Sequence, residues 1–115
     1  MVRAPEPPIA HADVETAEQL MRSRFAAYAR RDAGYVLETW HPSTRPDSLD
    51  LDEDLQWVAL QIVEASPTHS GPDGEQATVH FRASWRSRTE RGLLEERSTF
   101  VREGGLWFYV DGEVS

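Results

Sequence analysis

The sequence predicts an α+β domain in which N-terminal helices pack on a curved antiparallel sheet of about four strands. Helical periodicity is confined to Thr16–Trp40, period-two alternation marks the later segments, and Gly104-Gly105 joins the last two of these. A chain of 115 residues is long enough for one hydrophobic core. We therefore expect one domain over Asp13–Ser115, preceded by a flexible, proline-rich arm over Met1–Ala12.

Composition excludes several classes of protein. The net charge is −8, whereas broad nucleic-acid binding normally needs a basic face. With no cysteine, disulfides, thiolate zinc sites and cysteine catalysis are excluded. No apolar run has the length of a membrane span, and the N-terminus has no signal-peptide core. We expect a soluble cytoplasmic protein that binds no membrane, and the charge disfavours broad nucleic-acid binding.

The first helix has clear start and face signals. Thr16 followed three residues later by Gln19 is a capping box, and an apolar face with one arginine follows it. That face consists of Leu20, Met21, Arg24, Phe25 and Tyr28.

A second, shorter helix follows directly. Asp32 can cap it, and Pro42 disfavours helical geometry at His41, so the helix should end near Trp40. Its apolar face consists of Tyr35, Val36, Thr39 and Trp40. Two short helices with apolar faces need a sheet to cover.

Four segments are predicted as strands, after an acidic loop over Asp47–Gln56. They are Gln56–Thr68, Gln76–Ser87, Gly92–Glu103 and Leu106–Asp111. The first ends at a turn, Ser70–Gly74, and the last two form a hairpin.

The turns fix a register, and the register separates two faces. With a two-residue turn at Gly104-Gly105 and a loop at Arg88–Arg91, one face collects Val79, Phe81, Ala83, Trp85, Leu94, Glu96, Ser98, Phe100, Trp107, Tyr109 and Asp111. This aromatic face should lie under the helices. The opposite face has Leu93, Val101, Leu106, Phe108 and Val110, to which we add Val58, Leu60 and Ile62. That face is too apolar for open water, so we expect a homodimer through the outer sheet face.

Two segments resemble a known family. LMRSRFAAYARRDAGYVLETWHPSTRP and, later, ERSTFVREGGLWFYVDGEV are similar to the YchJ-like family of small uncharacterised bacterial proteins, within the NTF2-like superfamily. The resemblance covers Thr16 to the C-terminus and implies an NTF2-like cone with no established activity. Many members also carry a cysteine-rich, SEC-C-type zinc segment, which is lacking in this sequence. No zinc role is therefore carried over.

Polar residues on the predicted core face mark a candidate site. Arg24, Glu96, Ser98 and Asp111 should meet between helix and sheet, since a buried charge is costly unless it is paired. One interpretation is a structural salt bridge that ties helix to sheet. The other is the polar base of a ligand pocket with a carboxylate able to act as acid or base. The ligand-binding residues would then also include the aromatic residues Tyr28, Trp40, Trp57, Phe81 and Tyr109, which would fill an ordinary core equally well.

Other motifs carry weaker indications. His41, between a Trp and a Pro, is a general base or, more commonly, a capping residue at the pocket mouth with Arg45. His11, His69 and His80 lack ligand spacing, and the Asp50–Gln61 segment lacks the Gly and Glu of a calcium loop, so no metal is expected. No nucleotide-binding motif is present, and no cofactor is expected.

Two functions of different classes follow, with a third behind them. The first is a non-catalytic module that binds a small-molecule ligand or a protein. The second is a small-molecule enzyme, such as an isomerase, dehydratase or hydrolase, that uses Asp111 or Glu96 as acid/base and Arg24 as charge partner. The third is association with nucleic acid or the translation machinery through the basic hairpin of Arg82, Arg86, Arg88 and Arg91, where nearby glutamates favour a solvated edge.

Overall fold

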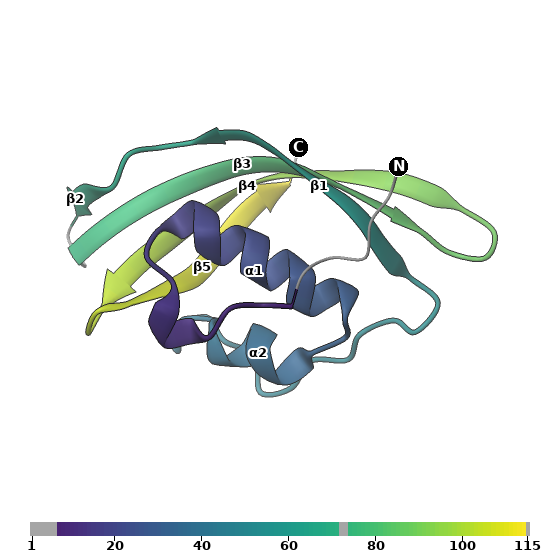
Figure 1. The fold of residues 1–115 in the computed structure, drawn as a ribbon, viewed down its shortest axis with the longest axis horizontal. Helices are drawn as coiled ribbons and strands as arrows, with labels where there is room; N and C mark the ends of the chain where they lie inside the picture. Colours follow the sequence, from purple (N-terminus) through teal and green to yellow (C-terminus); the bar gives the residue numbers. More distant parts are fainter. Residues whose placement is uncertain (1–6, 72–73, 115) are drawn as a thin grey trace.

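Two helices lie against the concave face of a curved antiparallel sheet, as the sequence predicts (Figure 1). The computed structural model describes residues 7–71 and 74–114. The elements in chain order are η1 (His11–Asp13), α1 (Ala17–Ala29), α2 (Ala33–Glu38), β1 (Gln56–Ala65), β2 (His69–Gly71), β3 (Gly74–Arg86), β4 (Arg91–Glu103) and β5 (Leu106–Val114).

Both helices begin where their capping residues predict. The Thr16 hydroxyl accepts from the backbone N–H of Gln19 at 3.1 Å, while the Gln19 side chain accepts from the Glu15 N–H at 2.6 Å. The Asp32 carboxylate accepts from the Tyr35 N–H at 3.0 Å. These bonds satisfy donors that the first turn of a helix leaves unpaired.

The sheet has the order β1-β3-β4-β5, with β2 paired to the start of β3. It therefore has five strands, one more than the sequence predicts, because β2 overlaps the start of the predicted Ser70–Gly74 turn. Residues 72 and 73 of that turn lie outside the described part of the chain. Gly104 and Gly105 have φ of 59° and 82°, which confirms the tight β4–β5 turn.

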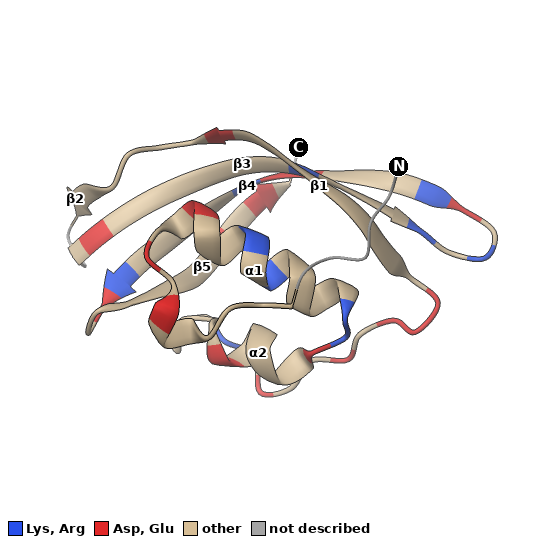
Figure 2. Cartoon of the chain, viewed as in Figure 1, with Lys and Arg blue, Asp and Glu red and all other residues tan. Residues whose placement is uncertain are grey.

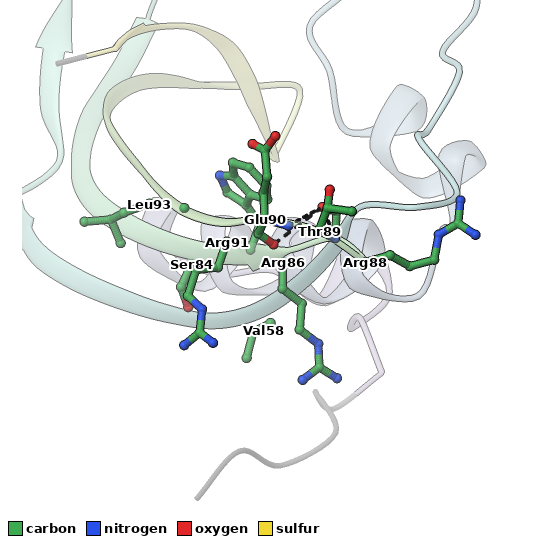
Figure 3. Close-up of a pocket in the computed structure, with 11 residues that line it drawn as sticks. Val58, Ser84, Arg86, Arg88, Thr89, Glu90, Arg91 and Leu93 are labelled. Carbon is green, nitrogen blue, oxygen red and sulfur yellow. Dashed lines mark hydrogen bonds between the residues drawn. The ribbon is translucent and has the colours of Figure 1, made fainter.

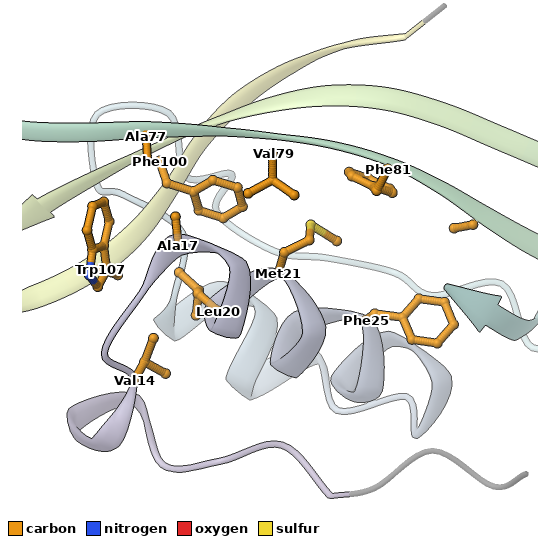
Figure 4. Close-up of a cluster of buried hydrophobic side chains, with 11 residues drawn as sticks. Val14, Ala17, Leu20, Met21, Phe25, Ala77, Val79, Phe81, Phe100 and Trp107 are labelled. Carbon is orange, nitrogen blue, oxygen red and sulfur yellow. The ribbon is translucent and has the colours of Figure 1, made fainter. Parts of the chain in front are cut away.

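The core lies between α1 and the concave face (Figure 4). Its buried members are Val14, Ala17, Leu20, Met21, Phe25, Ala77, Val79, Phe81, Ala83, Phe100 and Trp107. Leu60 and Ile62 pack against this core, so their predicted place on the outer face is wrong. The reason is an irregularity in β1 between Trp57 and Ala59, after which Leu60 pairs with Ala83 and Ile62 with Phe81.

A bulge between β4 and β5 changes the predicted position of Asp111. Phe100 pairs with Tyr109 as expected, but Thr99 then pairs with Asp111, so Val110 is an extra residue. Side chains alternate between faces along a strand, and the extra residue therefore turns Asp111 away from the helices. At the other hairpin, Phe81 pairs with Glu96, which shifts the predicted pairing by two residues and keeps every side chain on its face.

The segment before α1 packs on the edge of β5. The buried His11 ring donates from Nε2 to the Trp107 carbonyl oxygen at 2.6 Å and meets the edge of Phe108. The Ile9 N–H donates to the Ser23 hydroxyl at 2.9 Å. Of the predicted arm over Met1–Ala12, residues 1–6 lie outside the described part of the chain. The contacts of Ile9 and His11 hold the rest of the arm against the domain.

The convex face of the sheet carries a ladder of cross-strand charges. Glu95 accepts from His80 at 2.6 Å and from Arg82 at 3.3 Å, while Glu64 lies 3.7 Å from Arg97. Elsewhere, acidic residues follow the loop between α2 and β1, and basic residues gather at the β3–β4 hairpin (Figure 2). In the described part of the chain, none of the helices has the length and apolar character to cross a membrane.

Candidate functional site

A cavity of about 180 Å³ lies between α1 and the concave face of the sheet. Seven of its lining residues are ones that the sequence predicts for the site: Arg24, Tyr28, Trp57, Phe81, Glu96, Ser98 and Tyr109. Met21, Phe25, Ala83 and Leu94 complete the wall, and Figure 4 shows Met21 and Phe25 extending from α1. The helix and the sheet therefore bring most of the predicted site together.

Arg24 is buried, with 3% of its surface exposed, and it links the two helices. Its Nη1 donates to the Val36 carbonyl oxygen at 2.8 Å and to the Thr39 hydroxyl at 2.7 Å. Val36 belongs to the last turn of α2, whose carbonyls have no partner within the helix. Arg24 thus caps the C-terminus of α2, where the helix dipole favours a cation.

Three aromatic rings surround the same guanidinium. Its central carbon lies 4.5 Å from the ring centre of Tyr109, 5.3 Å from that of Trp40 and 6.0 Å from that of Tyr28. Aromatic faces stabilise a cation, more strongly when water is excluded. Among the ion pairs of the described residues, none includes Arg24. The helix-to-sheet link is therefore a stacked cation rather than the predicted salt bridge.

Burial changes the ionisation of this cluster. It lowers the pKa of Arg24, because desolvation penalises the charged form, although the neighbouring Tyr28 and Tyr109 act in the opposite direction. Burial, and then the nearby charge of Glu96, raises the pKa of the Tyr109 hydroxyl well above its ordinary value. Burial raises the pKa of Tyr28 as well. Both hydroxyls therefore stay protonated and can donate hydrogen bonds into the cavity at neutral pH.

Glu96 is held in the cavity by two neighbours. The buried Ser98 hydroxyl donates to its Oε2 at 2.5 Å. On the adjacent strand, Gly112 leaves room for the carboxylate, because a Cβ at that position would overlap Glu96 Oε2. Glu96 is therefore a positioned acceptor that faces the hydroxyl-bearing wall.

Two predicted ligand-binding residues are not in the cavity lining. Asp111 is exposed and lines a separate groove of about 450 Å³ with Thr99 and His41, because the bulge at Val110 turns it outward. Its predicted meeting with Arg24 is therefore wrong. Trp40 lies behind Arg24, with its ring edge-on to Tyr109 at 5.1 Å between centroids. It supports the arginine rather than the cavity wall.

His41 also lies away from the cavity. Its Nδ1 accepts from the Ser43 N–H at 3.1 Å, so its Nε2 carries the proton and donates to Glu103 at 3.0 Å. Its backbone N–H donates to the Tyr109 carbonyl at 2.7 Å, which fastens the chain after α2 to the edge of β5. These contacts match the capping and packing interpretation of His41.

A larger hollow of about 760 Å³ lies at the β3–β4 hairpin (Figure 3). The guanidinium groups of Arg86, Arg88 and Arg91 spread apart around it instead of converging on one point. Arg88 pairs with Asp54 at 3.2 Å, and Arg86 donates to the Gln56 side chain at 3.1 Å. We regard the smaller cavity as the better candidate, since its aromatic walls and positioned carboxylate converge.

No metal site is evident in the described ranges, where no group of three His, Cys, Asp or Glu side chains is placed to hold an ion.

Sequence reasoning missed Thr39 and Gly112 as parts of the site. Thr39 lies on the predicted face of the second helix, which was a usable signal. The role of Gly112 depends on a cross-strand contact that no local pattern reveals.

Helices packed on a strongly curved antiparallel sheet, with a cavity between the layers, define an NTF2-like domain. Residues 16–112 match the family described as "YchJ, middle NTF2-like domain", and the chain belongs to that family. The predicted family and fold are therefore confirmed.

Bacterial relatives agree with this assignment. A UPF0225 protein of Streptomyces avermitilis is 50% identical over 105 residues, covering 89% of this chain and 69% of that protein. One from Vibrio parahaemolyticus is 40% identical, covering 89% of this chain and 62% of that protein.

Two solved structures have the same fold. A SEC-C motif containing protein from Rhodopseudomonas palustris is similar with a TM-score of 0.73 and 34% identity, covering 87% of this chain and 79% of its own. A SEC-C motif containing protein from Psychrobacter arcticus matches with a TM-score of 0.69 and 28% identity, covering 92% of this chain and 63% of its own.

Proposed function

We propose that this domain is a binding module whose small-molecule site is the cavity between α1 and the sheet. The observation that carries the proposal is the combination of aromatic walls with one positioned carboxylate, Glu96, and two protonated hydroxyls, those of Tyr28 and Tyr109. Ligand sites typically have mostly apolar walls with a few well-placed polar groups. Arg24 serves this site by holding α2 and Tyr109 in position.

The volume limits the size of the ligand. Sites for drug-sized molecules usually occupy about 300–1,000 Å³, whereas this cavity has about 180 Å³. The proposal therefore concerns a compact molecule of one ring rather than a nucleotide or a long chain.

The experiment is a screen of one-ring compounds by ligand-observed NMR, followed by thermal denaturation with the hits. A ligand that binds the native state stabilises it in proportion to its occupancy. Ala83→Leu, which adds side-chain volume to the cavity wall, should abolish binding. Ala65→Leu is the matched control, because it makes the same change at an exposed position of β1 outside the cavity lining. Binding that survives Ala83→Leu, or a screen without hits, would refute the proposal.

A second candidate is a small-molecule enzyme with Glu96 as acid/base. Its support is the position of Glu96 in the cavity beside hydroxyls that could polarise a substrate carbonyl. Asp111 has no part in this candidate, since it lies on the other face. Turnover of bound one-ring compounds, lost in Glu96→Gln, tests it: compounds that bind and stay unchanged over a long incubation would exclude it.

We further propose that the chain forms a homodimer through the outer sheet face, in the cytoplasm. Leu93 is exposed there, and the charges around His80, Arg82 and Glu95 are already paired within one chain. Paired charges cost less to bury than isolated ones. A chain without cysteine needs no oxidising compartment.

Sedimentation equilibrium tests the dimer. Leu93→Arg should shift a wild-type dimer to monomers, because it places an unpaired charge in the interface. A wild-type protein that sediments as a monomer at every concentration would refute this proposal.

A further inference from the structure

The polar groups of the cavity differ in whether they already have partners, and this difference specifies a ligand. We propose that the cavity takes an uncharged, planar, one-ring molecule with an N–H donor beside a carbonyl acceptor, such as an aromatic amide or lactam. This inference rests on the proposed binding function and adds the chemical class of the ligand.

Size and shape select a flat ring. A cavity of about 150 Å³ lined by apolar side chains holds one benzene molecule, and this cavity is slightly larger, at about 180 Å³. Phe25 and Trp57 meet edge-to-face, with ring centroids 6.4 Å apart, and Phe81 lines the same cavity from β3. Rigid aromatic surfaces of this kind favour a flat ligand of about ten non-hydrogen atoms.

The charge of Arg24 is already satisfied by the protein. It makes two hydrogen bonds at the end of α2 and lies over the ring of Tyr109. A ligand carboxylate would have to compete for Arg24 with these contacts and would also face the Glu96 carboxylate. The site therefore disfavours an anion.

A cation is disfavoured for the complementary reason. Arg24 and Glu96 both line the cavity, so their formal charges cancel within it. An ammonium or amidinium beside Glu96 would leave the cavity with a net positive charge next to the buried Arg24. An excess charge beside a buried cation is costly.

The remaining hydrogen-bonding capacity suits an amide. Glu96 Oε2 accepts from Ser98, and its Oε1 has no partner among residues 7–71 and 74–114, so it can accept an N–H from a ligand. The hydroxyls of Tyr28 and Tyr109 both line the cavity, and a phenolic oxygen that accepts from Arg24, as that of Tyr28 does, still keeps its own O–H to donate. They can donate to a carbonyl oxygen. A primary amide or a lactam offers both groups side by side.

Three compounds of nearly the same shape test the charge preference: benzamide is neutral, benzamidine is a cation and benzoate is an anion. Each has about ten non-hydrogen atoms, for which binding near the millimolar range is expected. Isothermal titration with the wild-type chain should give a Kd for benzamide that is at least about tenfold lower than for either charged compound. Glu96→Gln keeps the side-chain shape and removes the negative charge. In this variant the affinity for benzamide should fall, and the affinity for benzoate should rise relative to that for benzamide.

The outcomes separate the two levels of the proposal. Suppose that the wild-type protein binds benzamidine or benzoate more tightly than benzamide, and that Ala83→Leu abolishes this binding. The proposed ligand class would then be wrong, whereas the proposed binding function would still hold. Binding of benzamide that is unchanged in Glu96→Gln would also overturn the ligand class. Failure of all three compounds to bind the folded protein would overturn the ligand class, and a failed one-ring screen would separately overturn the binding function.

Discussion

Replacement of Arg24 by methionine tests how the helical layer is held together. Methionine keeps much of the aliphatic packing of arginine, but it removes both donors to Val36 and Thr39 and the stacked cation over Tyr109. We predict that Arg24→Met destabilises the fold while leaving its strand content unchanged.

The magnitude follows from opposing contributions. Two hydrogen bonds from a charged donor are worth about 1.5–3 kcal/mol each, and cation–π contacts add about 0.5–2 kcal/mol. Removing a buried charge returns several kcal/mol of desolvation cost. The single proton of the Thr39 hydroxyl lies closer to the Tyr35 carbonyl oxygen, at 2.8 Å, than to that of Val36, at 3.3 Å, so the Val36 carbonyl loses its strongest donor. The expected net loss is about 3 kcal/mol of unfolding free energy.

Urea denaturation followed by circular dichroism measures this loss. Arg22→Met is the matched control: it makes the same substitution on the same helix, where Arg22 forms an exposed pair with Glu18. The control should change stability by less than about 0.5 kcal/mol. If Arg24→Met is as stable as the control, the stacked arginine contributes nothing net, and our account of the helical layer is wrong.

Three further predictions concern the cavity and the ionisable groups. Gly112→Ala should displace the Glu96 carboxylate, because the added methyl group overlaps it. The affinity for benzamide, measured by isothermal titration, should fall by about tenfold. An unchanged affinity would contradict the placement of Glu96. The raised pKa of Tyr109 means that its share of stability is complete below the ordinary value of 10.0 and is lost as pH rises toward the folded pKa. The phenolate absorbance of Tyr109 should therefore appear together with unfolding as the pH is raised. A protein that stays folded while all three of its tyrosines ionise near pH 10 would contradict this prediction. The hydrogen bond from His80 lowers the pKa of Glu95 below its ordinary 4.5, so that share of stability is present above pH 4.5 and is lost as pH falls through the folded pKa. Glu95→Gln should flatten the acid side of the urea stability profile, and a profile identical to wild type would count against the ladder.

The fold follows from local signals in the sequence. Thr16 and Asp32 cap the helices as their positions indicate, and Gly104-Gly105 forms the predicted turn. Side-chain alternation along β3 and β4 then places Glu96 and Ser98 under α1, even though the loop prediction is wrong by two residues. An even shift of register leaves each side chain on its face, so the candidate cavity tolerates this error.

The errors have a common physical cause. The predicted face of Asp111 is wrong because a single extra residue, Val110, interrupts the β4–β5 ladder. The predicted face of Leu60 and Ile62 is wrong because β1 has such an irregularity between Trp57 and Ala59. Bulges depend on contacts with neighbouring chain segments, such as the hydrogen bond from the Thr44 hydroxyl to the Val110 carbonyl at 2.6 Å. Periodicity within one strand does not predict such long-range contacts.

Intermolecular nuclear Overhauser effects between benzamide and the protein give the most direct test of whether the space beneath α1 is a binding site. We predict contacts from the benzamide ring to the side chains of Phe25, Trp57 and Phe81, which disappear in Ala83→Leu. Contacts confined to the hairpin groove around Arg88 and Leu93, or no contacts at ligand excess, would contradict the account.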